Sequence, residues 1–213
     1  MYLTRLRLDP RSAQVRRDLS NPYDMHRSLV RAFVADETAT QPRFLWRIEP
    51  SGDWATPVVL VQSVHMADWS VLSTRPHYLK QKVETKSVDL EALLQEGSRY
   101  RFRLVANPTV TKDGKRYGLT SEEAQLDWLA RQGEKHGFTL VTGQQDQKYA
   151  VMVAESRVLK GLKSGQPPIH LQQVHYEGLL KLENAAALNQ ALSTGIGPGK
   201  SFGCGLLSVA RVS

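Results

Sequence analysis

The segment Arg99-Tyr100-Arg101-Phe102-Arg103-Leu104 alternates arginine with apolar residues. Successive side chains of a β-strand point to opposite faces of a sheet, so the alternation predicts a strand with one buried face and one basic, solvated face. Arg5-Leu6-Arg7-Leu8 repeats the pattern near the start of the chain. This echo predicts two tandem copies of one unit, with residues 1–96 in the first domain and 97–213 in the second. Two unrelated strands remain the alternative, because alternation of this kind is common.

Each half of the chain reads as strand, helix, two strands, helix and strand, although the second helix of the first half is faint. Asn21-Pro22 opens the first helix, since proline suits the first helical position. Thr120 is expected to cap a helix of the second half, with Glu123 at capping-box spacing. This order fits an α+β fold of two ferredoxin-like domains, each βαββαβ. The other expected strands are residues 44–48, 58–64, 138–141, 148–154, 169–182 and 205–212, with residues 80–88 extended and a helix over 184–192 capped by Asn184.

The composition is that of a basic globular protein. Of the 213 residues, 41% are hydrophobic and 23% are charged. Lysine and arginine number 28 against 21 acidic residues, and the resulting net charge of +7 favours a polyanionic partner. Cys204 is the only cysteine, which fits a reducing, cytoplasmic compartment. The sequence has no signal-peptide pattern and no apolar run of 18 residues, so we expect no association with a membrane.

A glycine-rich segment lies near the C-terminus. Residues 195–207 contain five of the 15 glycines, in the order Gly-Ile-Gly-Pro-Gly-Lys-Ser-Phe-Gly-Cys-Gly-Leu-Leu. Thr194 stands where a Walker A loop needs glycine, and Phe202 stands where a dinucleotide fingerprint needs it. We therefore interpret the segment as a loop whose backbone approaches a polyanion. A helix C-cap with a tight connection to a strand is the alternative. The residues expected to contact the polyanion are Gly197, Gly199, Lys200 and Ser201.

One helix carries residues suited to phosphodiester chemistry. Tyr23 and His26 are three positions apart and share a helix face, with Arg27 and Arg31 beside them. Histidine can move a proton near neutral pH, and the cations can stabilise charge on phosphoryl oxygens. The alternative is that Tyr23 and His26 border the apolar stripe of this helix and only pack there.

Residues 156–176 contain no acidic residue and surround a turn signal at Pro167-Pro168. This pattern predicts a basic β-hairpin, and a two-stranded ribbon can straddle a nucleic-acid groove and contact phosphates. An ordinary solvated hairpin is equally consistent with the pattern. The cations expected to make the contacts are Arg157, Lys160 and Lys163.

Other kinds of active site find little support in the sequence. No two of the six histidines have the spacing of zinc ligands, and there is no cluster of acidic residues beside them. A Gly-x-Ser-x-Gly nucleophile elbow is also absent from the sequence. We therefore expect no metal site and no cofactor.

Taken together, these segments resemble the CasE family, the CRISPR repeat-processing endoribonucleases of the Cascade complex. The resemblance covers essentially the whole chain, and its motifs are specific in combination and order. They are Met1-Tyr2-Leu3-Thr4, Asn21-Pro22-Tyr23-Asp24-Met25-His26, Arg101-Phe102-Arg103-Leu104-Val105-Ala106-Asn107-Pro108, Tyr176-Glu177-Gly178, Gly195-Ile196-Gly197-Pro198-Gly199-Lys200 and Gly203-Cys204-Gly205-Leu206-Leu207-Ser208.

The resemblance implies two ferredoxin-like domains of the RAMP type and metal-independent cleavage of precursor CRISPR RNA. The cut would fall at the 3′ base of the repeat hairpin and leave a 2′,3′-cyclic phosphate. By the family pattern, His26 is the acid/base histidine with Tyr23 beside it, and the basic hairpin grips the RNA stem. The implied partners are the repeat RNA, as precursor and mature crRNA, and the other Cascade subunits. A subunit of the same fold that binds CRISPR RNA without cutting it is the main rival.

Overall fold

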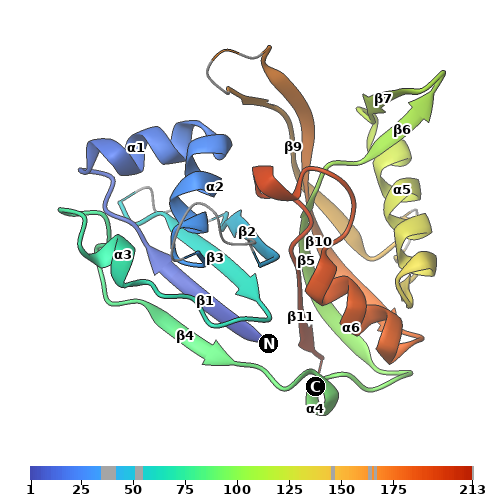
Figure 1. Cartoon of the computed structure of the whole chain (residues 1–213). Coiled ribbons are helices and arrows are strands. Elements are labelled where there is room, and N and C mark those ends of the chain that lie inside the picture. The colour runs from blue at the N-terminus through green and yellow to red at the C-terminus, as the bar shows by residue number, and fades with distance from the viewer. Residues whose placement is uncertain (35–41, 51–54, 145–146, 163–164, 166, 213) are drawn as a thin grey trace. The chain divides into compact units, whose positions relative to one another are not determined.

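A computed structural model describes residues 1–34, 42–50, 55–144, 147–162, 165 and 167–212 (Figure 1). The chain forms two compact α+β units. Residues 1–88, 160–169 and 201–203 make up the first unit, and residues 89–159, 170–200 and 204–213 the second. The chain thus first passes between the units after Val88, whereas a folding boundary at residue 96 stays a prediction.

The first unit has a four-stranded sheet in the order β2-β3-β1-β4. The pairs β1–β3, β1–β4 and β2–β3 are all antiparallel. Taking the strands in chain order as one to four, this is the 4-1-3-2 arrangement of a ferredoxin-like βαββαβ unit. The elements are β1 (Tyr2–Arg7), α1 (Ala13–Ser20), α2 (Pro22–Val30), β2 (Phe44–Ile48), β3 (Val58–Ser63), α3 (Ser70–Ser73) and β4 (Glu84–Ser87).

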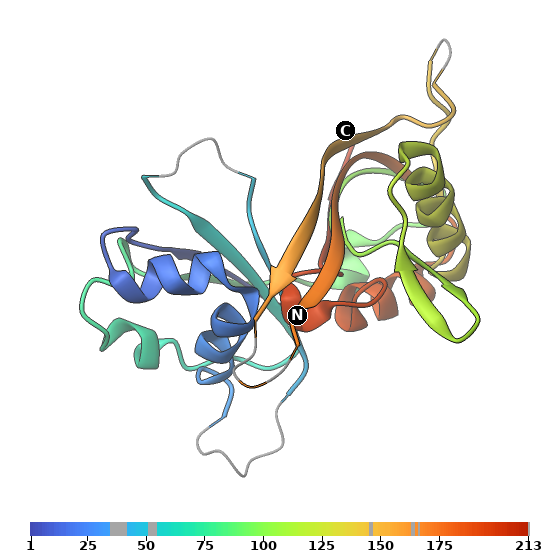
Figure 2. The ribbon, with the colours of Figure 1, turned by 90° about the horizontal axis from the view of Figure 1, so that it is seen from above.

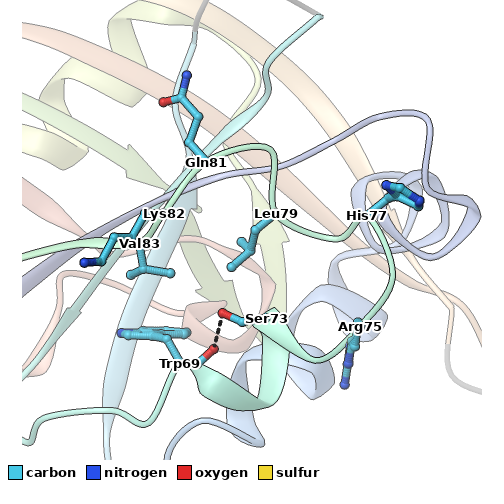
Figure 3. Close-up of a pocket in the computed structure, with 8 residues that line it drawn as sticks. All are labelled: Trp69, Ser73, Arg75, His77, Leu79, Gln81, Lys82 and Val83. Atoms are coloured by element: carbon cyan, nitrogen blue, oxygen red, sulfur yellow. Dashed lines mark hydrogen bonds between the residues drawn. The ribbon is translucent and has the colours of Figure 1, made fainter.

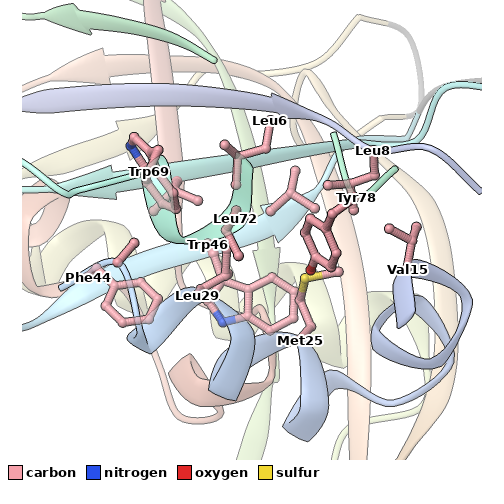
Figure 4. Packing of buried hydrophobic residues seen from close by; sticks show 13 residues of the cluster. Leu6, Leu8, Val15, Met25, Leu29, Phe44, Trp46, Trp69, Leu72 and Tyr78 are labelled. Carbon is pink, nitrogen blue, oxygen red and sulfur yellow. The ribbon is translucent and has the colours of Figure 1, made fainter. Parts of the chain in front are cut away.

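The core of the first unit lies between one face of this sheet and its helices (Figure 4). Every second residue of the strands points into it, as the predicted alternation requires. Leu6 of β1 pairs with Val59 of β3, and both are fully buried. Met25 and Leu29 of α2 cover this face from one turn to the next. On the other face of β1, Arg5 and Arg7 form ion pairs with Glu84.

The second unit repeats the arrangement, with a sheet in the order β11-β5-β10-β8. Strand β9 pairs with β10 off this path, and the two run side by side in both views (Figure 1, Figure 2). A separate hairpin, β6–β7, follows β5. The elements are α4 (Leu90–Leu93), β5 (Arg99–Ala106), β6 (Thr109–Lys112), β7 (Lys115–Gly118), α5 (Glu122–Lys135), β8 (Phe138–Leu140), β9 (Val151–Gly161), β10 (Ile169–Leu182), α6 (Ala185–Thr194), a 3₁₀ turn (Lys200–Phe202) and β11 (Leu207–Arg211).

Strand β5 confirms the alternation that predicted it. Tyr100, Phe102 and Leu104 are buried, whereas Arg99 and Arg101 are exposed. The buried residues belong to the core that α5 and α6 help to close, since Trp128 of α5 stacks on Tyr176 of β10 with ring centroids 6.5 Å apart. The two tandem ferredoxin-like units expected from the sequence are therefore present.

Several details differ from the sequence prediction. The cap of α5 is Ser121 rather than Thr120, because the Ser121 hydroxyl accepts the hydrogen bond from the Ala124 amide. Strand β9 begins at Val151 rather than at residue 148 and continues to Gly161. The β6–β7 hairpin was not foreseen, although its turn residues Asp113 and Gly114 both have the positive φ of a tight hairpin turn. Among the residues described, no helix has the length and apolar character needed to cross a membrane.

Candidate active site

Helix α2 carries the predicted catalytic residues and begins where the sequence indicates. The Asn21 side chain accepts a hydrogen bond from the Tyr23 amide at 3.3 Å, and Pro22 occupies the first helical position. The inward face holds Met25 and Leu29, both buried. Tyr23 and His26 therefore lie one turn apart at the edge of this buried face.

The His26 imidazole is half-buried and rests on an aromatic stack. Its ring lies 5.2 Å from the Phe44 ring at an interplanar angle of 22°, and Phe44 in turn stacks on Phe33 at 4.5 Å. Within the described part of the chain, Nδ1 of His26 is buried with no hydrogen-bond partner. Burial lowers the pKa of His26 to about 4, because the apolar surroundings disfavour the imidazolium. At neutral pH the ring is therefore uncharged and able to accept a proton.

The predicted cations of α2 lie on its exposed side. Arg27 forms an ion pair with Asp24 at 3.7 Å, and its guanidinium lies 5.9 Å from the centroid of the Tyr23 ring. Arg31 follows the last residue of the helix and is exposed. Arg27 thus touches Tyr23 directly, and its charge is partly balanced by Asp24.

The rear of α2 is held by a buried polar network. The carboxylate of Asp18, at the end of α1, accepts hydrogen bonds from Ser28 Oγ at 2.5 Å and from the Tyr78 hydroxyl at 2.8 Å. Arg17 donates to the other carboxylate oxygen, and Arg75 donates to Ser28 Oγ. Helix α2 is thereby fixed to α1 and to the segment after α3.

Strand β2 supports two parts of the candidate site from one face. Phe44 and Trp46 are two positions apart, so both side chains point the same way. Phe44 carries the His26 ring, whereas Trp46 lies under Gly203, where an added Cβ would come within 3.1 Å of the indole. The turn that contains Ser201 is thus packed onto the same unit as His26. Lys160 also belongs to this unit.

The glycine-rich loop has a structural requirement for its glycines. All five adopt φ between +76° and +95°, a region that other residues rarely occupy. At Gly197 an added Cβ would also lie 3.0 Å from the Trp128 ring. Backbone geometry therefore accounts for Gly197 and Gly199 without a ligand, and their contact with RNA stays a prediction. Burial lowers the pKa of His136, and the positive charges of Lys135 and Lys200 lower it further.

The predicted hairpin cations lie in different environments. Arg157 forms an ion pair with Glu155 at 3.2 Å and donates two hydrogen bonds to the side-chain oxygen of Gln173. It is therefore held in place by protein groups, with about half of its side chain exposed. Lys163 lies outside the described residues.

A pocket of about 470 Å³ in the first unit is a separate feature (Figure 3). Its polar side chains do not converge, since Gln81 and Arg75 point to opposite sides in Figure 3. Neither Tyr23 nor His26 lines it. In the described ranges, no group of three or more His, Cys, Asp or Glu residues is arranged to hold a metal ion.

The chain thus combines two ferredoxin-like units with a histidine on helix α2, a basic hairpin and a glycine-rich loop near its C-terminus. Residues 1–211 match the family described as CRISPR associated protein, and the chain belongs to that family. The CRISPR-associated endoribonuclease Cse3 of Thermus thermophilus is 37% identical over 215 residues, covering 99% of this chain and 100% of the relative. The CRISPR system Cascade subunit CasE of Escherichia coli is 31% identical, covering 88% and 91%.

Solved structures agree with the sequence relatives. Thermus thermophilus Cse3 bound to an RNA that represents a pre-cleavage complex superposes with a TM-score of 0.86, at 37% identity and 98% coverage of both chains. The resemblance to the CasE family is therefore confirmed, and so is the tandem ferredoxin-like fold that it implied.

The depressed pKa of His26 predicts a specific pH dependence of stability. Because the pKa rises from about 4 in the folded protein to 6.5 on unfolding, the unfolded chain binds the extra proton between these values, and stability falls as pH drops from 7 to 5. His26→Phe keeps an aromatic ring and removes this proton. Between pH 8 and pH 5 the parent should therefore lose about 2 kcal/mol more free energy of unfolding than His26→Phe loses. Urea unfolding at the two pH values measures this difference, and an unchanged difference would contradict the burial of a neutral imidazole.

Proposed function

We propose that this protein is an endoribonuclease that cleaves precursor CRISPR RNA within its repeats and keeps the product hairpin as a subunit of Cascade. The observation that carries the proposal is the half-buried His26, stacked on Phe44 and on the same helix as Tyr23, in a chain 37% identical to an endoribonuclease. The CasE relative is a Cascade subunit, which supports the same assembly for this chain. We place the enzyme in the cytoplasm, which fits its single cysteine.

The chemistry uses the nucleophile that RNA itself carries. The 2′-hydroxyl at the 3′ base of the stem attacks the adjacent phosphorus, so an O2′–P bond forms and the P–O5′ bond breaks. The products are a 2′,3′-cyclic phosphate and a 5′-hydroxyl end. Because its imidazole is neutral at pH 7, His26 can accept the proton of the 2′-hydroxyl. The 5′ oxygen takes up a proton from the Tyr23 hydroxyl or from water.

Arg27 and Arg31 stabilise negative charge on the phosphate and transfer no proton. Arg27 lies beside Tyr23 and Arg31 one further turn along, so both can stabilise the phosphoryl oxygens as charge develops. The stem is recognised as an A-form helix through its phosphates and shape. We assign that grip to Arg157, Lys160 and Lys163 of the hairpin and to Gly197, Gly199, Lys200 and Ser201 of the glycine loop.

His26→Ala should cripple cleavage while RNA affinity stays nearly intact, because the imidazole moves a proton and holds little of the stem. The single-turnover rate should fall roughly 10²–10⁴-fold, the usual contribution of a general acid or base. Filter binding on the same samples measures affinity. His65→Ala, at an exposed position after β3, is the matched control and should cut at the parental rate. Parental cleavage by His26→Ala would remove the histidine from the mechanism.

Cleavage should continue in EDTA and should stop when the nucleotide 5′ to the scissile phosphate lacks its 2′-hydroxyl. The reason is that the attacking oxygen belongs to the RNA and His26 supplies the base. Labelled repeat RNA and its single 2′-deoxy analogue, each incubated with and without EDTA, are compared on a denaturing gel. Cleavage of the deoxy analogue would overturn the transesterification. An intact repeat in every lane, with binding retained, would favour the rival non-cutting subunit.

The enzyme should retain its product. The hairpin and loop contacts hold the stem, which lies on one side of the cut. These contacts are the same before and after cleavage, so substrate and product bind about equally tightly. With a tenfold excess of repeat RNA, we expect product equal to the amount of enzyme. Rapid conversion of the whole excess by the parent would refute retention.

Joint change of Arg157, Lys160 and Lys163 to Ala should weaken stem binding. Each lost phosphate contact should reduce the salt slope of log K by roughly 0.7–0.9.

A further inference from the structure

Asn21 does more than cap helix α2. Its side-chain oxygen accepts hydrogen bonds from the amides of Tyr23 at 3.3 Å and Leu162 at 3.2 Å. Its side-chain nitrogen donates to the Leu162 carbonyl at 2.9 Å and to Asp24 Oδ2 at 2.9 Å. Leu162 directly follows strand β9 of the basic hairpin. All of these residues belong to the first compact unit.

A second asparagine cap shows that capping a helix needs only one side-chain hydrogen bond. Asn184 caps α6 by accepting one hydrogen bond from the Ala187 amide at 2.9 Å. Asn21 also accepts one capping bond, from the Tyr23 amide two residues on, and in addition pairs with both backbone groups of Leu162. Its amide thus acts as a peptide group would in a β-ladder, with one donor and one acceptor facing one residue. The pairing joins two segments 141 residues apart in the sequence.

The residue before Leu162 is docked independently. A Cβ on Gly161 would come within 2.3 Å of the Phe202 ring, so glycine lets the end of β9 pack directly against that ring. Phe202 stands beside Gly203, which packs on Trp46. Lys160, a predicted contact of the RNA stem, immediately precedes Gly161 and Leu162 in the chain. A displacement of Lys160 on RNA binding would therefore be transmitted to the Leu162 backbone, to which Asn21 is hydrogen-bonded.

We propose that Asn21 is a positioning residue that couples the grip of the hairpin on the RNA stem to the alignment of Tyr23 and His26. The inference rests on the proposed function. Tyr23 is two residues and His26 five residues after Asn21, so a rigid first turn transmits the position of Leu162 to both side chains. Serine can cap the helix but is too short to pair with both Leu162 groups. Aspartate can cap and accept, but it cannot donate to the Leu162 carbonyl.

The primary test compares Asn21→Ser with Asn184→Ser, the same substitution at a cap whose side chain makes no hydrogen bond to the described residues of the hairpin. Serine is a good N-cap, so both variants should unfold near the parental urea midpoint. Single-turnover cleavage is measured at saturating repeat RNA, where affinity no longer limits the rate. Asn21→Ser should slow cleavage roughly 10–100-fold, the scale expected when reacting groups are misplaced by about an ångström. Asn184→Ser should cut like the parent.

Lys160→Ala, made in the parent and in Asn21→Ser, separates coupling from a merely structural role. In the parent it should lower both affinity and the saturated cleavage rate. In Asn21→Ser it should lower affinity alone, because the hairpin no longer reaches the catalytic helix. An equal loss of rate in both backgrounds would overturn the coupling. If Asn21→Ser fails to fold, Asn21→Asp replaces it with the same expected results.

A readout that does not require cleavage keeps this inference distinct from the proposed function. Hydrogen exchange of the amides of residues 23–26 is followed as uncleavable 2′-deoxy repeat RNA is added. Exchange should slow in the parent and in Asn184→Ser and should not change in Asn21→Ser. Equal protection in all three proteins would refute the role of Asn21. A parent that binds the unmodified repeat without cutting it would refute the proposed function instead, whatever the exchange result.

Discussion

The buried carboxylate of Asp18 is the interaction on which the candidate site depends. A fully buried acidic side chain is costly unless hydrogen bonds satisfy its oxygens, and here Ser28, Tyr78 and Arg17 do so. Hydrogen bonds to a charged group contribute roughly 1.5–3 kcal/mol each, so the arrangement of donors around Asp18 is strongly preferred over any alternative. Ser28 is two residues from His26 on α2. The network thus fixes the rotation of the helix, which decides that His26 meets Phe44 rather than solvent.

Much of the fold follows from short-range patterns in the sequence. Alternation predicted β5, and the bounds of β2 and β10 coincide with the predicted ranges. Asn21 and Asn184 cap helices as expected, because an asparagine before an apolar periodic segment offers an acceptor to the first free amides. The choice between adjacent hydroxyls was wrong at α5, where Ser121 and not Thr120 has the geometry of a cap. The Asp113-Gly114 turn was also readable from the sequence, since it is a strong hairpin signal.

The candidate site was less predictable, since its contacts join distant segments. Spacing placed Tyr23 and His26 on one helix, but the stacking of His26 on Phe44 depends on how β2 lies under α2. The same holds for the depressed pKa of His26, which results from burial and not from a neighbouring charge. The glycine-rich pattern by itself favours a loop whose backbone approaches a polyanion. Its positive φ values and the contact of Gly197 with Trp128 supply a packing reason that no sequence pattern separates from a binding reason.

The shared face of Phe44 and Trp46 limits how β2 can change length during evolution. Two different segments, the His26 ring and the turn at Gly203, rest on neighbouring positions of one strand. A shift of β2 by one residue against β3 would turn both aromatic rings to the opposite face together. Strand β2 can therefore tolerate substitutions but not a change in its pairing register with β3. The β6–β7 hairpin is paired mainly with itself and closes through a tight turn, so it can lengthen two residues at a time without disturbing either unit's core.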